Sequence, residues 1–359
     1  MKSVYIHIPF CNTICSYCDF PKILSNVCHK NIYLDELRKE IIKNYKNDEI
    51  NTIYIGGGTP SILSKEELKK LLEITNIFNK KNLAEFTIEC NIESIDEEKL
   101  KLMIHYGVNR ISIGIESFDK KIICYLGRFH TKKESLKKIK LVKKYFENIN
   151  IDLMYAVPNQ SIKSLKKDIK TCLKLKVPHV SCYSLIIEPH TKLYNENTNY
   201  IDEEIDYKMY KIIDKKLKKY NHYEISNFAL EGHESKHNLV YWNNDEYYGF
   251  GMGASGYIDG IRYTNTKNIN EYLSGNYRYE ENILTEKEKM QEEMFLGLRK
   301  LKGVNIDNFE KKYHKKIEKV FDIDDLLNKN ILIKKDGYIF INKNYIYTSN
   351  DIMIRFVGD

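Results

Sequence analysis

Short runs of β-branched residues alternate along the chain with longer segments whose apolar residues recur every three or four positions. The first pattern predicts strands and the second predicts amphipathic helices. Strands are expected at Ser3–Ile8, Thr52–Ile55, Glu85–Cys90, Arg110–Ile115, Asn150–Tyr155 and Val180–Ile186. Helices are expected at Ile32–Asn47, Lys65–Phe78, Asp96–Tyr106, Lys132–Phe146, Ile162–Leu175 and Glu203–Tyr220.

Six strand-and-helix units in this order predict an α/β protein whose parallel sheet curls into an open or partial (β/α)6 barrel. The pattern changes after about residue 224, where Gly-rich and aromatic sequence appears. Two further helices, near Thr285–Leu298 and Ile306–Tyr313, and short strands around Ile331–Ile341 then follow. We therefore expect residues 1–244 to form the barrel and residues 245–359 to form a smaller α+β unit similar to a winged helix.

Composition narrows the class of protein. The 359 residues are 42% hydrophobic and 30% charged, which is typical of a soluble globular protein, and no apolar run approaches the roughly 18 residues that span a bilayer. The net charge is +7, but Lys and Glu alternate through the predicted helices, a pattern typical of a solvated helix face, so we expect no nucleic-acid partner. An acidic ligand such as a porphyrin carboxylate fits this sign of charge. No export signal is visible, and a cytoplasmic location is expected.

Three of the eight cysteines, Cys11, Cys15 and Cys18, form a CxxxCxxC loop directly after the first predicted strand. Such a loop can turn three thiolates onto one iron–sulfur cubane and leave the fourth iron open to a small molecule. The alternative is a zinc site that adds His7, but zinc loops favour paired CxxC units. We therefore predict a 4Fe-4S cluster. The remaining cysteines are not grouped and are not expected to be ligands: Cys28, Cys90, Cys124, Cys172 and Cys182.

A glycine loop, GGGTP at residues 56–60, follows the second predicted strand. Residues without a Cβ let the backbone approach a ligand closely. Acidic residues, Glu89, Glu116 and Asp152, stand at or near the ends of later strands. Because ligands bind at the carboxyl ends of parallel strands, we expect these side chains and the glycine loop to face the cysteine loop in one site.

Several phrases of the sequence resemble, in order, the radical S-adenosylmethionine (SAM) family of oxygen-independent coproporphyrinogen III oxidases and their heme-chaperone relatives. They are YIHIPF at 5–10, the GGGTP loop, ISIGIESF at 111–118, LGR at 126–128, DLMY at 152–155 and YEISN at 223–227. The resemblance covers nearly the whole chain and weakens after about residue 300.

The resemblance implies that Cys11, Cys15 and Cys18 hold the cluster and that SAM is held by Tyr5, Gly57, Gly58, Thr59, Glu89, Arg128 and Asp152. Glu116 stands where the family usually has Gln. This change adds a negative charge beside the cationic sulfonium and removes an amide donor. An alternative role for Arg128 and Asp152 is a structural ion pair beneath the strand ends.

Two kinds of relative, an oxidase and a heme-binding chaperone, must be separated. The oxidases have a further Cys two positions after the triplet and a longer arm before the first strand, whereas here Asp19-Phe20 follows Cys18. The segment HNLVYW at 237–242 resembles the HNxxYW motif of the chaperones. His237 or Tyr241 can ligate heme iron, and Trp242 can pack on the macrocycle. The alternative is that this segment closes the junction between the barrel and the C-terminal unit.

The sequence therefore predicts a heme chaperone that carries a 4Fe-4S cluster and SAM, binds heme and transfers it to acceptor apoproteins. One alternative is an oxygen-independent coproporphyrinogen III oxidase, which carries out radical SAM oxidative decarboxylation. Another is a radical SAM enzyme with an unrelated substrate. The sequence leaves open whether the acceptor lies at a membrane surface and whether the chain forms a homodimer.

Overall fold

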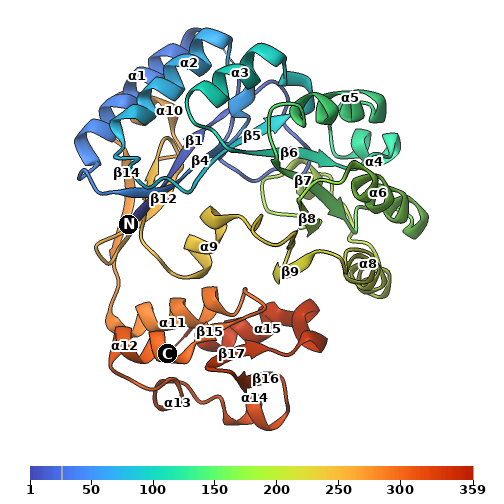
Figure 1. Cartoon of the computed structure of the whole chain (residues 1–359), viewed down its shortest axis with the longest axis vertical. Coiled ribbons are helices and arrows are strands. Elements are labelled where there is room, and N and C mark those ends of the chain that lie inside the picture. The colour runs from blue at the N-terminus through green and yellow to red at the C-terminus, as the bar shows by residue number, and fades with distance from the viewer. Residues whose placement is uncertain (26, 359) are drawn as a thin grey trace.

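The computed structural model describes the backbone of residues 1–25 and 27–358, and the side chains of these ranges apart from 27–29. Six parallel strands lie side by side in chain order and form the centre of one curved sheet (Figure 1). They are β1 (Lys2–Ile8), β4 (Ile50–Gly57), β5 (Glu85–Asn91), β6 (Arg110–Glu116), β7 (Asn148–Tyr155) and β8 (His179–Ser184). The predicted α/β fold with a partial barrel is confirmed.

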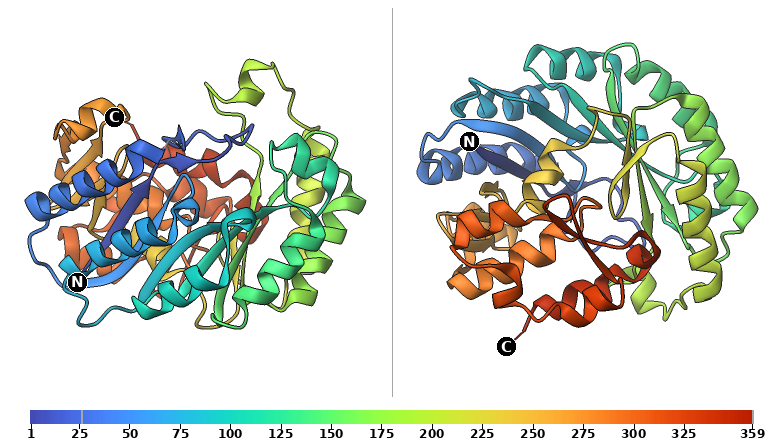
Figure 2. Two further views of the ribbon diagram at one scale, coloured as in Figure 1. Left: turned by 90° about the horizontal axis from the view of Figure 1, so that it is seen from above. Right: turned by 60° about the horizontal axis from the view of Figure 1, so that its bottom comes forward.

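Helices cover the outer face of this sheet, as Figure 2 shows. They include α1 (Val27–Asn44), α2 (Lys65–Ile74), α3 (Glu97–His105), α5 (Lys132–Val142), α6 (Ile162–Leu175) and α8 (Glu203–Lys216). Ser64 and Thr131 each start a helix with a capping box, which satisfies backbone amides of the first turn. The predictions for α2, α5 and α8 ran four residues too far, because a 3-10 turn, a loop and a turn follow these helices. The prediction for α1 began five residues late and ended three residues too far.

Shorter elements that the sequence patterns did not predict complete the barrel. α9 (Lys236–Trp242) lies inside the curve of the sheet and contacts β4 (Figure 2). These shorter elements are β2 (Phe10–Cys11), β3 (Ile23–Leu24), α4 (Lys120–Tyr125), α7 (Lys192–Asn195), β9 (Asn221–Glu224), β10 (Asn227–Ala229) and α9 (Lys236–Trp242).

Residues 247–283 belong to the sheet of the barrel, which differs from the predicted boundary at 244/245. β11 (Tyr247–Phe250) pairs with β1 in parallel, and β12 (Ser255–Ile258), β13 (Ile261–Asn265) and β14 (Arg278–Ile283) extend that edge, with α10 (Ile269–Leu273) between the last two. The Gly-rich and aromatic texture of this stretch reflects tight packing within the sheet. The Tyr263 hydroxyl, for example, accepts a hydrogen bond from the Gly249 amide at 2.9 Å.

The C-terminal unit has its own hydrophobic core, which begins at Met290. Its helices are α11 (Glu286–Gly297), α12 (Ile306–Tyr313), α13 (Ile317–Val320), α14 (Asp324–Asn328) and α15 (Ser349–Met353). They pack with a small antiparallel sheet of β15 (Val304–Asn305), β17 (Tyr338–Ile341) and β16 (Leu332–Lys335). The predicted α+β character of this unit is confirmed. Among the described residues, no helix is long and apolar enough to cross a membrane.

Candidate functional site

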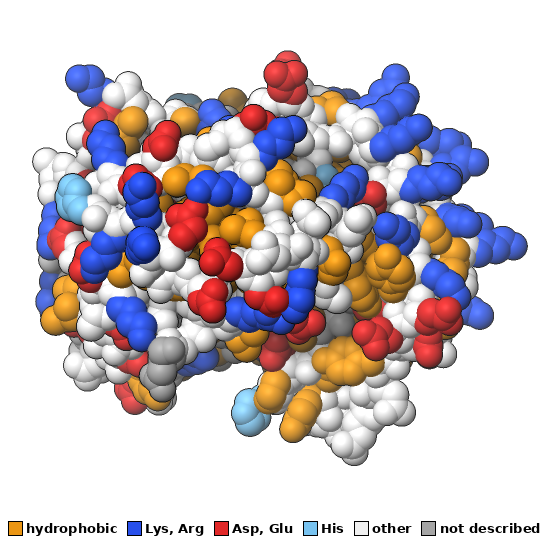
Figure 3. Space-filling model, turned by 90° about the horizontal axis from the view of Figure 1, so that it is seen from below, with side chains coloured by type: hydrophobic (Ala, Val, Ile, Leu, Met, Phe, Trp, Pro, Cys, Tyr) orange, Lys and Arg blue, Asp and Glu red, His pale blue; other side chains and the backbone are white. Residues whose placement is uncertain are grey.

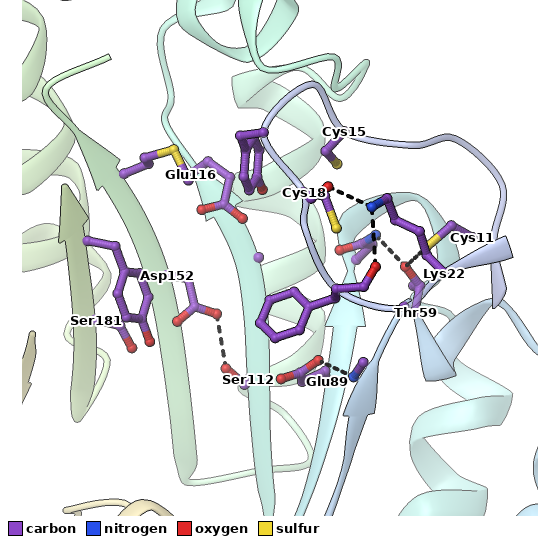
Figure 4. Close-up of a pocket in the computed structure, with 18 of the residues that line it drawn as sticks. Cys11, Cys15, Cys18, Lys22, Thr59, Glu89, Ser112, Glu116, Asp152 and Ser181 are labelled. Atoms are coloured by element: carbon purple, nitrogen blue, oxygen red, sulfur yellow. Dashed lines mark hydrogen bonds between the residues drawn. The ribbon is translucent and has the colours of Figure 1, made fainter. Parts of the chain in front are cut away.

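A cavity of about 450 Å³ opens at the carboxyl ends of the central strands, beneath the cysteine loop. Cys11, Cys15 and Cys18 line one side of it, and Figure 4 shows them on the loop above the strand ends. All three are free thiols. Burial raises the pKa of each thiol, that of Cys11 to about 11, so a thiolate here needs a bound cation in place of the lost water.

The cysteine loop is held from two directions. The Ser16 amide donates to the Leu126 carbonyl at 3.0 Å, and the Ser16 carbonyl accepts from the Leu193 amide of α7 at 3.0 Å. Gly127 has a φ of +74°, and a Cβ there would lie 2.9 Å from the Ser16 hydroxyl. Only glycine therefore suits this contact, which explains how the LGR phrase supports a loop more than a hundred residues earlier in the chain.

The glycine loop packs directly on the chain that leads into the cysteine loop. The amides of Gly58 and Thr59 donate to the carbonyls of Ile8 and Phe10, both at 2.9 Å. Gly57 has a φ of +108°, and a Cβ there would lie 2.4 Å from the His7 ring. The glycines are therefore required by close backbone packing as well as by the approach of a ligand.

Two of the acidic residues, Glu89 on β5 and Asp152 on β7, face the cavity from either side of β6 (Figure 4). Glu89 accepts from the Tyr54 hydroxyl at 2.7 Å and from the Gly57 amide at 3.2 Å. Asp152 accepts from Ser112 at 3.1 Å and from the Asn150 amide at 2.8 Å. Burial raises the pKa of both carboxyls, that of Glu89 to about 7. A cationic ligand in the cavity would favour their ionised forms.

Glu116 and Arg128 form a buried ion pair at the rim of the same cavity. The Arg128 Nη2 lies 3.0 Å from the Glu116 Oε1, and both side chains are less than a tenth exposed. Arg128 also donates to the Gly114 carbonyl at 2.9 Å. A register shift in β6 and a φ of +60° at Glu116 turn its carboxylate toward the arginine. Arg128 is thus paired with Glu116, whereas the sequence suggested Asp152.

The structure places the remaining predicted residues outside the lining of the cavity. Tyr5 donates or accepts a 2.9 Å hydrogen bond with the His7 Nδ1 and lies next to the Tyr54 ring. His237 is fully buried near the amino-terminal ends of the strands. Its two ring nitrogens bond the Thr52 hydroxyl and the Tyr241 hydroxyl, both at 2.7 Å. Neither nitrogen is free to ligate a metal in this arrangement.

Trp242 lies at the junction with the C-terminal unit. The Arg299 guanidinium stacks over its ring at 4.4 Å, and its indole N–H is buried with no hydrogen-bond partner in the described part of the chain. Asn238 of the same motif lines the cavity instead. The 237–242 segment therefore contacts the amino-terminal ends of the strands, the cavity and the C-terminal unit.

The other cysteines are spread through the fold. Cys90 lines the cavity wall, Cys124 is exposed at the end of α4, and Cys172 and Cys182 are buried, while the side chain of Cys28 lies outside the described residues. No three of the described Cys, His, Asp and Glu side chains gather around one point as the ligands of a single ion do.

Several polar residues of the cavity were not singled out from the sequence. They are Arg110, Ser112, Asn150 and Ser181, which point inward from β6, β7 and β8. The signal that could have found them is alternation: in Arg110-Ile-Ser112-Ile-Gly114-Ile-Glu116, every second residue is polar or glycine. Such alternation within a strand buried on both faces indicates a polar interior to the barrel.

Comparisons with known proteins agree with this architecture. Residues 5–172 match the model of the radical SAM superfamily, and residues 284–344 match that of the HemN C-terminal domain. The chain is 41% identical to the heme chaperone HemW of Lactococcus lactis subsp. lactis, over 100% of this chain and 98% of that protein. It is 38% identical to the heme chaperone HemW of Bacillus subtilis, over 100% of both.

The structure is also similar to that of coproporphyrinogen III oxidase (HemN) from Escherichia coli. The TM-score is 0.87 at 20% identity, and the match covers 99% of this chain and 89% of that chain. At this identity the likeness shows the fold alone. The matched region includes both the barrel and the C-terminal unit.

Proposed function

Because the chain belongs to the HemW family of radical SAM proteins, as the full-length identities of 41% and 38% show, we propose that it binds heme and transfers it to acceptor apoproteins. These full-length matches to heme chaperones are the observation that carries the proposal. The fold is shared with the oxidase and does not separate the two functions. The sequence after the triplet, Asp19-Phe20 instead of a further cysteine, favours the chaperone.

The cavity fits the two cofactors that the family implies. Three free thiols line one side, the glycine loop and the acidic strand ends line another, and the volume lies within the roughly 300–1,000 Å³ of small-molecule sites. In this proposal Cys11, Cys15 and Cys18 ligate a 4Fe-4S cluster. SAM contacts Gly57, Gly58, Thr59, Glu89, Glu116, Arg128 and Asp152, whereas Tyr5 lies outside the lining and supports its neighbour Tyr54, which lines the cavity. When bound, the cluster and SAM supply one-electron chemistry.

The chain's own residues would orient SAM by charge and by backbone contact. The Glu89 and Asp152 carboxylates attract a ligand with cationic groups, and the glycine loop allows the ligand to approach the backbone. The Glu116–Arg128 pair is neutral overall, so the negative charge that Glu116 adds is already balanced in the protein. This offsets the predicted effect of having Glu where the family usually has Gln.

The contacts with heme are part of the proposal. His237, Tyr241 and Trp242 are the predicted residues, and iron ligation by His237 requires its ring to leave both Thr52 and Tyr241. His237→Ala tests the imidazole as a ligand, and Tyr241→Phe tests the phenolate. A ligand's removal shifts the visible spectrum of bound heme, whereas the loss of a structural hydrogen bond lowers stability without such a shift.

Heme added to the anaerobically reconstituted protein is expected to give a Soret band and to quench the fluorescence of Trp242, the only tryptophan. The loaded protein should then pass heme to apomyoglobin. A parallel incubation with coproporphyrinogen III, SAM and a reductant should leave the porphyrinogen unchanged. Stoichiometric formation of protoporphyrinogen with consumption of SAM would instead establish the oxidase, even if heme also binds.

A lysine face on the outside of the barrel supports contact with an anionic surface. We define it as the lysines of α5 and α6, five in each helix. No ion pair among the described residues includes any of them. Figure 3 shows basic side chains crowded along its right-hand edge, the side of the molecule on which α5 and α6 lie in Figure 1. A membrane with anionic lipids is the proposed surface; a cytoplasmic location and a homodimer stay predictions.

Vesicles test the lysine face. Replacing Lys166, Lys167 and Lys170 together by Glu is expected to weaken binding to phosphatidylserine vesicles, measured by sedimentation, by ~100-fold or more, since each lysine near an anionic surface contributes about 1 kcal/mol and each added glutamate is repelled. The matched control makes the same change in charge at three exposed lysines elsewhere, Lys81, Lys287 and Lys335. Equal weakening by both triple variants would show that only net charge matters.

A further inference from the structure

Arg110 is a buried guanidinium that opens onto the cavity. It is the first residue of β6, its side chain is among the largest fully buried ones, and the residue is 2% exposed. Its Nε has no hydrogen-bond partner among the described residues, and none of the ion pairs described includes its guanidinium. A buried charge without a partner is costly and is normally found only where a function requires it.

Three carboxylates face the barrel interior near Arg110, and each is engaged elsewhere. Glu89 bonds Tyr54 and the Gly57 amide, and Asp152 bonds Ser112 and Asn150. Glu85 accepts the amides of residues 236 and 237 at the start of α9, at 2.9 and 3.2 Å. None of them lies within ion-pair distance of the Arg110 guanidinium, so its charge is not neutralised by contact.

The other groups around Arg110 are neutral. His179 bonds Asn150 and the Tyr223 hydroxyl, and burial lowers its pKa well below the usual value. Burial also lowers the pKa of His237 to about 3, so this ring adds no charge. Ser112, Asn150, Ser181 and Asn238 line the same cavity. Apart from the three carboxylates, which are engaged elsewhere, the surroundings are thus polar and uncharged, and they contain further hydrogen-bond donors.

We propose that Arg110 is the receptor for a carboxylate group of a ligand that enters the barrel through the cavity. A guanidinium presents two parallel N–H donors that match the two oxygens of a carboxylate. The Asn238 amide on the cavity lining supplies a further donor, which gives the HNxxYW segment a role in the cavity that does not depend on His237. The proposal rests on the proposed function, under which two ligands bring carboxylates: SAM through its amino-acid end and heme through its propionates.

The experiment compares Arg110→Gln with wild type in two arms on the reconstituted full chain. In the heme arm, heme and heme dimethyl ester are titrated by their Soret bands. In the SAM arm, SAM and its carboxamide are titrated by calorimetry. The variant should bind the ligand whose carboxylate it receives roughly 10- to 100-fold more weakly, while the affinity for the corresponding ester or amide stays unchanged. Arg38→Gln, at an exposed position, is the control for charge.

The outcomes distinguish the two sources of the carboxylate, and they distinguish failure of this proposal from failure of the proposed function. Weakened heme binding alone identifies a propionate, and weakened SAM binding alone identifies the SAM carboxylate. Unchanged affinity in both arms overturns the proposal. Absence of heme binding in wild type overturns the proposed function, but the SAM arm still tests Arg110 as a carboxylate receptor. A receptor role also predicts that the unliganded variant melts no lower than wild type, whereas a clear drop in its midpoint would indicate a structural role. If the variant fails to fold, wild type is titrated with the acid forms and with the ester or amide forms, and equal affinities for both overturn the proposal.

Discussion

Replacing Cys11, Cys15 or Cys18 singly by alanine is expected to lower the bound iron from about four atoms per chain to a small residual amount and to remove the brown colour. The three thiols line one side of one cavity, on a loop that Leu126 and α7 hold in place. With one ligand removed, the two remaining thiols are buried groups whose raised pKa favours the protonated form. Iron and sulfide analysis after anaerobic reconstitution measures the effect.

Two further cysteines provide matched controls for this series. Cys124→Ala changes an exposed thiol outside the cavity and should retain all of the iron. Cys90→Ser is the sharper control, because Cys90 lines the cavity but lies on β5 rather than on the loop. It should also retain the iron. Full iron content in all three loop variants, or zinc in place of iron, would contradict the assignment of the cluster.

The central fold could be predicted because local patterns and tertiary packing agree there. Each predicted strand coincides with a parallel strand of the sheet to within two residues at both ends, and α6 has the bounds that its apolar spacing indicated. The capping residues Ser64 and Thr131 act over three residues, so a short window contains the whole signal. The convergence of the glycine loop and the acidic strand ends followed from the parallel topology.

The parts that could not be predicted depend on partners distant in sequence. Residues 247–283 join the barrel because β11 pairs with β1, and no local pattern specifies a strand some 240 residues away. His237 is held by Thr52, and Glu116 by Arg128 rather than by a residue of its own strand. Arg110 was overlooked because a single charged residue at the start of an apolar run has the appearance of a strand boundary.

The Glu116–Arg128 pair is expected to make Arg128 essential for stability. Arg128→Met leaves the Glu116 carboxylate buried without its cation, and loss of one partner of a buried pair costs about 3–5 kcal/mol. For a domain of this size, such a loss lowers the midpoint of thermal unfolding by roughly 6 °C or more. Glu116→Gln keeps an oxygen that can accept from the arginine, and Arg128 keeps its bond to the Gly114 carbonyl. Arg128 loses its anion but keeps both hydrogen-bond acceptors, so this variant should lose less than Arg128→Met.

The dependence on pH separates a charge effect from a packing effect. Burial already raises the pKa of Glu116 above its usual value, and the Arg128 charge opposes this rise. In Arg128→Met the opposition is gone, so the pKa in the folded protein rises further above that of the unfolded chain. An acid with a raised pKa favours the folded state when protonated, and the folded state loses stability as pH rises through the interval between the two values. The deficit of Arg128→Met relative to wild type should thus be smaller at pH 5.5 than at pH 8.

The double variant Glu116→Gln/Arg128→Met, which removes both charges, should show no such dependence and should be more stable at pH 8 than Arg128→Met alone. Equal deficits at both pH values would assign the role of Arg128 to its packing and its bond to Gly114 instead of to its charge.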